Sequence, residues 1–199
     1  MTKTQFITRA LAILALCIGQ ALPLRADAPM TQIHAMIDRA MNAVREPGNG
    51  DDASRTERLR EIAGRTFDFQ EMAKRTMAEH WDRYRDRQDE FVTAFTRFVL
   101  NSYVSKIQSL KDEKMVYASE LFDGTVAQVN TQLIRAVGDP MPIGYRLHRV
   151  GEEWKIYDVL IERISLVENF RSQFARVLKI ASFDELLRKL QEKGGERGS

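Results

Sequence analysis

Asp158 is the residue of this sequence best placed to act as a general base. It lies within the apolar run 154–162, and in a β-strand it would share a face with Ile156 and Leu160. A carboxylate on an apolar face can have a raised pKa and accept a proton from a substrate. The alternative is a structural carboxylate paired with a nearby arginine or tyrosine. We favour the structural interpretation.

The other residue types that could carry chemistry are few and scattered. His34, His80 and His148 are the only histidines, and no two of them have the spacing of metal ligands on one helix. His148 alternates with Leu147, which predicts a surface or hydrogen-bonded strand residue. The sequence has no Gly-x-Ser-x-Gly motif, no glycine-rich phosphate loop and no dinucleotide-binding fingerprint. These observations argue against an enzyme, and we expect no cofactor and no metal.

Residues 145–174 offer apolar and aromatic surface instead of reactive groups. The pattern predicts a strand, a tight turn, a second strand and then an amphipathic helix. Ser165 with Glu168 forms a capping box at the start of that helix. Its expected core face includes Leu166, Phe170 and Phe174. This combination favours a protein that holds an apolar ligand over one that performs a reaction.

The first 26 residues have the layout of a secretory signal peptide. Lys3 and Arg9 form a positive start, and the apolar run 10–22 follows. That run is too short to span a bilayer comfortably. We predict cleavage after Ala26, since cleavage two residues later would leave a proline at the first mature position.

Removal of this segment changes both the charge and the cysteine content. The chain has 30 basic and 28 acidic residues, and three of the basic ones lie in the segment, so the net charge falls from +2 to −1. No basic surface for nucleic acid then remains. The single cysteine, Cys17, also lies in the segment, and Leu16 before it argues against lipid attachment. The rest of the chain needs no disulfide, which suits the bacterial periplasm.

We expect one domain over residues 27–193, with a loop at 46–52 and a frayed tail at 194–199. Helical spacing dominates the first half, where the longest helix is expected over 87–110. Alternating patterns then predict strands over 115–122, 126–135, 145–150 and 154–162, with a loop at 138–142. Two further helices follow. The result is an α+β fold, in which helices pack on one face of a four-stranded antiparallel curved sheet. Side chains either fill the cleft between sheet and helices or leave it open.

Polar residues mark the expected helix starts. Ser54 with Glu57, Asp68, and Ser182 with Glu185 are placed to act as N-caps. The helix that begins at Asp68 is expected to carry its apolar face through Met77 to Trp81.

The aromatic stripe of the longest helix allows two interpretations. Phe91, Phe95, Phe98 and Tyr103 recur at helical spacing, and methionines are frequent in the first half of the chain. Methionine adapts to irregular apolar pockets, so both sets could line a binding site. Ordinary core packing explains them equally well, and from spacing alone we favour the core.

With these residues in view, the chain resembles the periplasmic phospholipid-shuttle proteins called MlaC, also known as toluene-tolerance (Ttg2-type) proteins, which are auxiliary to an ABC transporter. The resemblance runs in order through nearly all of the chain after the signal peptide. The residues that carry it are Phe67-Asp68-Phe69, Met72-Ala73, Lys74-Arg75-Thr76, Trp81, Gln88, Phe91, Tyr145-Arg146-Leu147, Trp154-Lys155-Ile156-Tyr157-Asp158-Val159, Ile161-Glu162 and Ser165-Leu166-Val167-Glu168-Asn169-Phe170-Arg171-Ser172-Gln173-Phe174.

This chain departs from the family pattern at two positions. The family usually has a glycine after the pair Ile161-Glu162, where this chain has Arg163. The family also has Leu-Gly before the tryptophan, where Met77-Ala78 stands here. A sister branch, HpnM, is associated with hopanoid lipids, and one sequence does not separate the two branches.

The resemblance implies a carrier with an NTF2-like or cystatin-like fold, whose ligand's acyl chains lie in a cavity between sheet and helices. The implied partners are a phospholipid or hopanoid, an inner-membrane ABC transporter complex and an outer-membrane lipoprotein complex. The residues that we predict to line the cavity are Met72, Met77, Trp81, Phe95, Val99, Tyr103, Val129, Leu133, Leu147, Tyr157 and Phe174. Arg146 and Arg163 are predicted at its mouth, near the headgroup. The rival hypotheses are an enzyme with Asp158 as base and a transporter adaptor that carries nothing.

Overall fold

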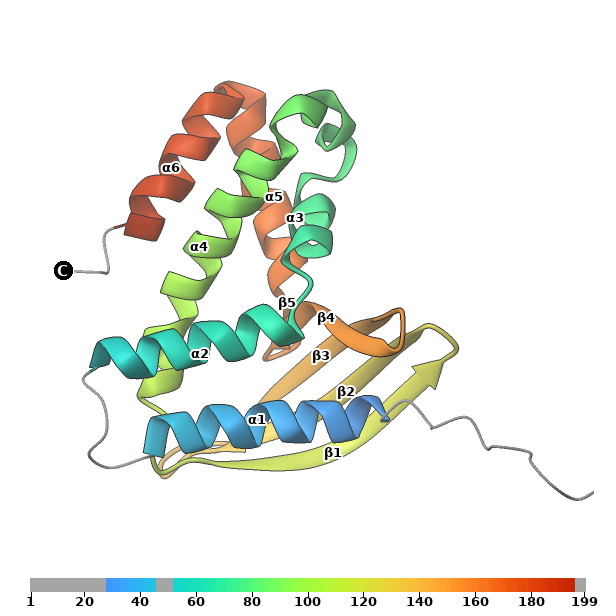
Figure 1. Cartoon of the computed structure of the whole chain (residues 1–199), viewed down its shortest axis with the longest axis vertical. Coiled ribbons are helices and arrows are strands. Elements are labelled where there is room, and N and C mark those ends of the chain that lie inside the picture. The colour runs from blue at the N-terminus through green and yellow to red at the C-terminus, as the bar shows by residue number, and fades with distance from the viewer. Residues whose placement is uncertain (1–27, 46–51, 196–199) are drawn as a thin grey trace, which may run out of the picture.

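The structure, a computed structural model, describes residues 28–45 and 52–195. The expected signal peptide, Cys17 and the loop residues 46–51 therefore lie outside the described part of the chain, as do the last four residues of the expected tail. The described part forms six α-helices and one antiparallel sheet, as the sequence pattern predicted (Figure 1).

The helices and strands alternate as blocks along the chain. The first block contains α1 (Pro29–Arg45), α2 (Asp52–Thr66), α3 (Phe69–Met77), the short 3₁₀ turns η2 (Ala78–His80) and η3 (Asp82–Arg87), and α4 (Gln88–Gln108). The sheet contains β1 (Lys114–Asp123), β2 (Val126–Ile134), β3 (Met141–Val150), β4 (Glu153–Ile161) and β5 (Ile164–Ser165). The chain then forms α5 (Leu166–Ile180) and α6 (Phe183–Gly195).

The five strands follow one another in the sheet in chain order, so the sheet is a meander. The expected four strands are all present, and the two residues of β5 add a short fifth strand against β4. The loop expected at 138–142 is shorter than predicted, because β3 already begins at Met141. Pro142 fits this strand because it pairs with Gln132, and its carbonyl oxygen accepts a hydrogen bond from the backbone N–H of Glu162.

Two groups of helices share the apolar surface. Helices α1 and α2 lie across one face of the sheet, and α3, α5 and α6 gather beyond the end of β4 (Figure 1). Helix α4 is long enough to belong to both groups, since it packs against α2 near its C-terminus and against α3 and α6 elsewhere. The arrangement places one half of α4 over the sheet and the other half inside a helical bundle.

Local signals fix most helix starts where the sequence predicted them. The side chains of Asp68, Ser165 and Ser182 accept hydrogen bonds from the backbone N–H groups three residues later, at distances of 2.8, 3.0 and 3.2 Å. The prediction for Ser54 was wrong, because α2 begins at Asp52 and Ser54 already lies in its first turn. Asp52, at the start of α2, is also a residue type that favours helix starts, so it is as good a signal as Ser54.

Two helix ends differ from the expectation. Helix α3 stops at Met77 because Ala78 takes a positive φ of 45°, so Trp81 lies beyond the helix and not on its apolar face. Helix α6 continues to Gly195, two residues into the stretch predicted as a frayed tail. The carbonyl oxygen of Gly194 accepts a hydrogen bond from the Asn101 side chain, and Gly194 lies against the backbone of Phe98. Contact with α4 therefore holds this end of the helix.

Candidate functional site

An apolar cavity of about 210 Å³ lies between α1, α2 and α4 on one side and the sheet on the other. Every element that bounds it contributes aliphatic side chains, with a few aromatic rings among them. The lining residues are Met36, Ile37, Ala40, Met41, Leu59, Ile62, Ala63, Phe67, Phe69, Met72, Val99, Leu100, Tyr103, Val104, Ile107, Leu110, Met115, Ile143, Tyr145, Val159, Ile161 and Leu166. No lining residue is charged, so the cavity suits a hydrocarbon ligand.

Two tyrosines bring the only hydroxyl groups to this lining. Burial raises the pKa of Tyr145 above its usual range. Burial also raises the pKa of Tyr103. Both phenols therefore stay neutral at ordinary pH. A neutral hydroxyl in an apolar cavity can donate one hydrogen bond, for example to an ester carbonyl, but it cannot serve there as a base.

The structure brings three of the eleven predicted lining residues to the cavity. Met72, Val99 and Tyr103 line it, and they come from α3 and from the C-terminal half of α4. Met72 and Val99 are buried, whereas Tyr103 is half-buried and lies next to Lys106, whose Nζ is 4.9 Å from the ring centre.

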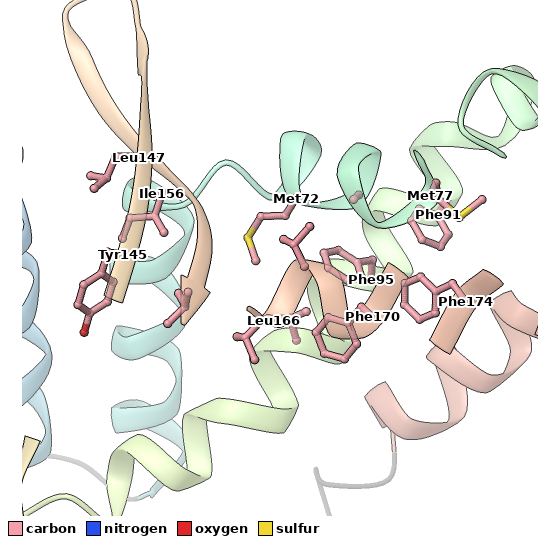
Figure 2. Close-up of a cluster of buried hydrophobic side chains, with 14 of the residues drawn as sticks. Met72, Met77, Phe91, Phe95, Tyr145, Leu147, Ile156, Leu166, Phe170 and Phe174 are labelled. Carbon is pink, nitrogen blue, oxygen red and sulfur yellow. The ribbon is translucent and has the colours of Figure 1, made fainter. Parts of the chain in front are cut away.

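Phe95 and Phe174 lie instead in a separate packed group of rings, the phenylalanine cluster, formed by Phe91, Phe95, Phe170 and Phe174 (Figure 2). Phe95 meets Phe170 and Phe174 edge to face, with ring centres 5.8 and 6.2 Å apart. Met77 and Trp81 lie beside this cluster, against a gap that has no room for a water molecule. The core interpretation of the aromatic stripe thus holds for these residues.

The four predicted strand residues also lie outside the cavity. Val129, Leu133 and Leu147 are fully buried against neighbouring side chains. Tyr157 lies at an irregularity in the pairing of β3 and β4, next to His148, and carries the guanidinium of Arg75 over its ring, at 4.2 Å. The predicted face was correct, since Val129 pairs with Tyr145 and Leu147 is two residues from it on β3, but the strand residues that reach the cavity are Met115, Ile143, Tyr145, Val159 and Ile161.

The two arginines predicted at the mouth have different surroundings. Arg146 is engaged within the protein, since its Nη1 lies 3.2 Å from Asp158 and 3.4 Å from Glu168. Arg163 is exposed in the turn between β4 and β5. It follows Ile161, a residue of the cavity wall, by two positions in the chain.

Asp158 is a structural carboxylate, as favoured from the sequence. It is buried, and both of its oxygens accept hydrogen bonds. Oδ2 accepts one from the hydroxyl of Ser165, at 2.6 Å, and Oδ1 accepts one from the backbone N–H of Val167, at 3.1 Å. Together with Arg146 these contacts satisfy the charge and attach the first turn of α5 to β4. The same turn carries Leu166 into the cavity wall.

A second polar contact fixes α3 in the same way. Nε2 of His148 lies 2.9 Å from Oδ2 of Asp68, whose other oxygen caps α3. His148 is therefore a hydrogen-bonded strand residue, as expected. The two contacts hold α3 and α5, the helices that carry Met72 and Leu166, in fixed positions on the sheet.

Helices α1 and α2 supply the largest set of lining residues that the sequence did not single out for the cavity. Met36 and Met41 of α1 are among the methionines that are frequent in the first half of the chain, and α2 adds Leu59, Ile62 and Ala63. Two signals in the sequence could have indicated this wall of the cavity. One is the methionine content of α1, and the other is the pair of alanines Ala40 and Ala63, whose small side chains leave space beside larger neighbours. In the described part of the chain, no helix is both long and apolar enough to cross a membrane.

The family comparison decides the relationship. The model of the family described as MlaC protein matches residues 34–192, which is most of the chain and includes every element around the cavity except the start of α1. This chain belongs to the MlaC family.

Two named members of the MlaC family are similar to this chain at low identity. The toluene tolerance protein ttg2D of Pseudomonas putida is 25% identical over 124 residues, which cover 61% of this chain and 58% of that protein. The intermembrane phospholipid transport system binding protein MlaC of Haemophilus influenzae is 22% identical over 116 residues, which cover 56% of this chain and 54% of that protein. The matched region is thus little more than half the length of either relative.

A solved structure extends the likeness over almost the whole fold. The phospholipid-binding protein of Ralstonia solanacearum, solved in complex with a phospholipid, superposes with a TM-score of 0.75 at 19% identity. The superposition covers 85% of this chain and 98% of that protein. At this identity the comparison establishes the fold.

Both departures from the MlaC family pattern fall on strained backbone. Ala78 has φ 45° and ψ −120°, and Arg163 has φ 70°, next to Glu162 with φ 50°. Glycine adopts positive φ without steric cost, whereas a residue with a Cβ does not. The family's glycines thus fit this backbone better than Ala78 and Arg163 do. Both turns nevertheless keep their positive φ in this chain.

Proposed function

We propose that this protein is a periplasmic phospholipid carrier. It takes a phospholipid at one membrane, encloses the acyl chains in the cavity between α1, α2, α4 and the sheet, and delivers the lipid at the other membrane. The proposed partners are an inner-membrane ABC transporter complex and an outer-membrane lipoprotein complex. The phospholipid named in the Haemophilus and Ralstonia proteins supports this choice of cargo.

The observation that carries the proposal is the uncharged lining of the cavity. Twenty-two residues surround it, all of them apolar except for two tyrosines with neutral hydroxyl groups. A reaction needs groups that exchange protons, electrons or bonds, and such groups are missing from this wall. Asp158, the candidate base, is committed to Ser165, Val167 and Arg146.

Burial of hydrocarbon is sufficient to keep a lipid out of water. Each buried methylene contributes about 0.8 kcal/mol, so two acyl chains contribute on the order of 20 kcal/mol gross. The lining methionines of α1 and α3 can change rotamer to admit chains of irregular shape. Release then depends on a partner that opens the cavity or offers an apolar path, because a lipid this well buried does not leave readily on its own.

The lining residues that we assign to the lipid include Met72, Val99 and Tyr103 from the sequence-based prediction. The remaining eight predicted residues lie outside the lining. Arg163 stays a proposal for the headgroup, since it is exposed on the turn that follows Ile161.

Native mass spectrometry of the exported protein tests the function. The full chain is expressed with its own N-terminus, purified from the periplasm without detergent, and weighed before and after organic extraction. We expect an adduct of phospholipid mass that disappears on extraction. An adduct of hopanoid mass would move the cargo to the sister branch. A bare protein, even after incubation with phospholipid vesicles, would contradict the proposal and favour an adaptor that carries nothing.

A further inference from the structure

The cavity ends abruptly at the phenylalanine cluster, and this end has a defined floor. Met72 of α3, Val99 of α4 and Leu166 of α5 line the cavity, whereas Phe95, one turn before Val99, does not. Figure 2 shows Met72 and Leu166 beside the rings of Phe95 and Phe170, with the rest of the cluster farther along the same row.

The rings behind the floor leave no room for a ligand. Phe95 is fully buried, and its ring is held by Phe91 at 5.9 Å and by Phe170 at 5.8 Å between ring centres. Phe170 in turn stacks with Phe174 at 5.8 Å. Rings that interlock edge to face cannot turn aside without breaking several contacts at once. The backing is therefore rigid.

The floor itself is made of side chains that differ in how far they reach. Met72 has no exposed surface and has a long unbranched side chain, whereas Val99 is short and branched. The contacts of Asp68 with His148 and of Asp158 with Ser165 hold the two flanking helices in place. Side-chain length at Met72 and Leu166, set against the rigid rings, thus determines the depth of the cavity.

We propose that Met72 and Leu166 determine the acyl-chain length that this protein accepts. The inference rests on the proposed function, since it concerns the same cavity and the same cargo. Shortening either side chain deepens the cavity by up to three methylene-sized groups, because the phenylalanine cluster does not collapse into the space. Each additional methylene that gains burial favours the longer chain about fourfold.

A competition between two phospholipids measures this preference. The full chain is incubated with vesicles of equimolar phosphatidylglycerol carrying 14-carbon or 18-carbon monounsaturated chains, recovered free of vesicles, and extracted for mass spectrometry. The measured quantity is the ratio of 18-carbon to 14-carbon lipid in the bound fraction. We expect this ratio to rise at least fourfold in Met72→Ala and in Leu166→Ala relative to the unaltered chain.

Met77→Ala is the matched control. Met77 is on the same helix as Met72 and equally buried, but it faces the gap without room for water and not the cavity. Its ratio should equal that of the unaltered chain. A milder variant, Met72→Val, replaces Met72→Ala if circular dichroism shows loss of the fold.

The outcomes separate the inference about acyl-chain length from the proposed carrier function. Unchanged ratios in folded floor variants that bind lipid would overturn the inference and leave the carrier function intact. An equal rise in Met77→Ala would also overturn it, because general loosening of the core would then be the cause. Failure of the unaltered chain to bind either lipid would contradict the proposed function itself.

Discussion

The two halves of α4 contain similar apolar residues but have opposite surroundings. In the first half, Phe91 and Phe95 are interlocked with rings from α5 and leave no space. In the second half, Val99, Tyr103 and Ile107 face the cavity. The difference arises from the side chains that lie opposite. The first half meets the large rings of α5 and α6, whereas the second half meets aliphatic side chains of α1, α2 and the sheet.

The comparison shows why a helical stripe does not by itself distinguish a core from a binding site. Both halves of α4 continue one periodic pattern, and that pattern only requires that a face be removed from water. Whether a void remains depends on the total volume that the facing elements supply. Rings fill the space over the first half, whereas the second half meets shorter side chains such as Ala40 and Ala63.

The largest expected effect comes from truncating one ring in each half. Phe95→Ala should lower the free energy of unfolding by about 3–5 kcal/mol, because it empties a fully packed site. Tyr103→Ala should cost only about 1–2 kcal/mol, since its ring is half-buried and already borders a void. Urea unfolding of lipid-free protein, followed by circular dichroism, measures both values.

Lipid-free protein is needed because a bound ligand adds its own stabilisation to the folded state. Equal costs for the two substitutions would contradict the distinction between a packed half and an open half.

A smaller effect is expected at the two strained turns. Ala78→Gly and Arg163→Gly should each raise the free energy of unfolding by about 0.5–1 kcal/mol, since glycine relieves the strain of positive φ. The turn at Ala78 ends α3, and the turn at Arg163 precedes α5. These two helices carry the floor residues Met72 and Leu166. In Ala78→Gly only the backbone strain changes, so the lipid content of this variant should stay the same.

Ala175→Gly provides the control of opposite sign for these turns. Ala175 lies within α5, where the backbone is helical, so glycine should cost up to about 1 kcal/mol there. Thermal unfolding of the three variants gives the signs. A loss of stability in both Ala78→Gly and Arg163→Gly would mean that the turns are not strained as described.

The fold was largely predictable from the sequence because its signals are local. Alternation predicted β1, β2 and β4 to within a residue or two, and the caps at Asp68, Ser165 and Ser182 depend on side chains three residues from their partners. The start of β3 was missed because Pro142 is a turn signal, and its place in the strand depends on pairing with β2.

The cavity was much less predictable, since it depends on distant elements. Met72 and Met77 are five residues apart on one helix and are equally buried, yet only Met72 reaches the cavity. Five residues turn a helix by about 140°, so the two side chains point in different directions, but the sequence alone does not show which direction leads to the cavity. The break at Ala78, which moves Trp81 away from the face of α3, was visible only as a departure from the family's glycine.

A charge placed in the cavity wall tests the central claim most directly. Val99→Glu puts a carboxylate into the apolar lining, where a hydrocarbon chain would have to lie against it, whereas Ser105→Glu adds the same charge on the exposed side of α4. Both proteins are purified from the periplasm without detergent, checked for fold by circular dichroism, and extracted for phospholipid. We expect Val99→Glu to retain at least tenfold less lipid than Ser105→Glu. Equal lipid content in the two folded variants would contradict the assignment of the cavity as the lipid site.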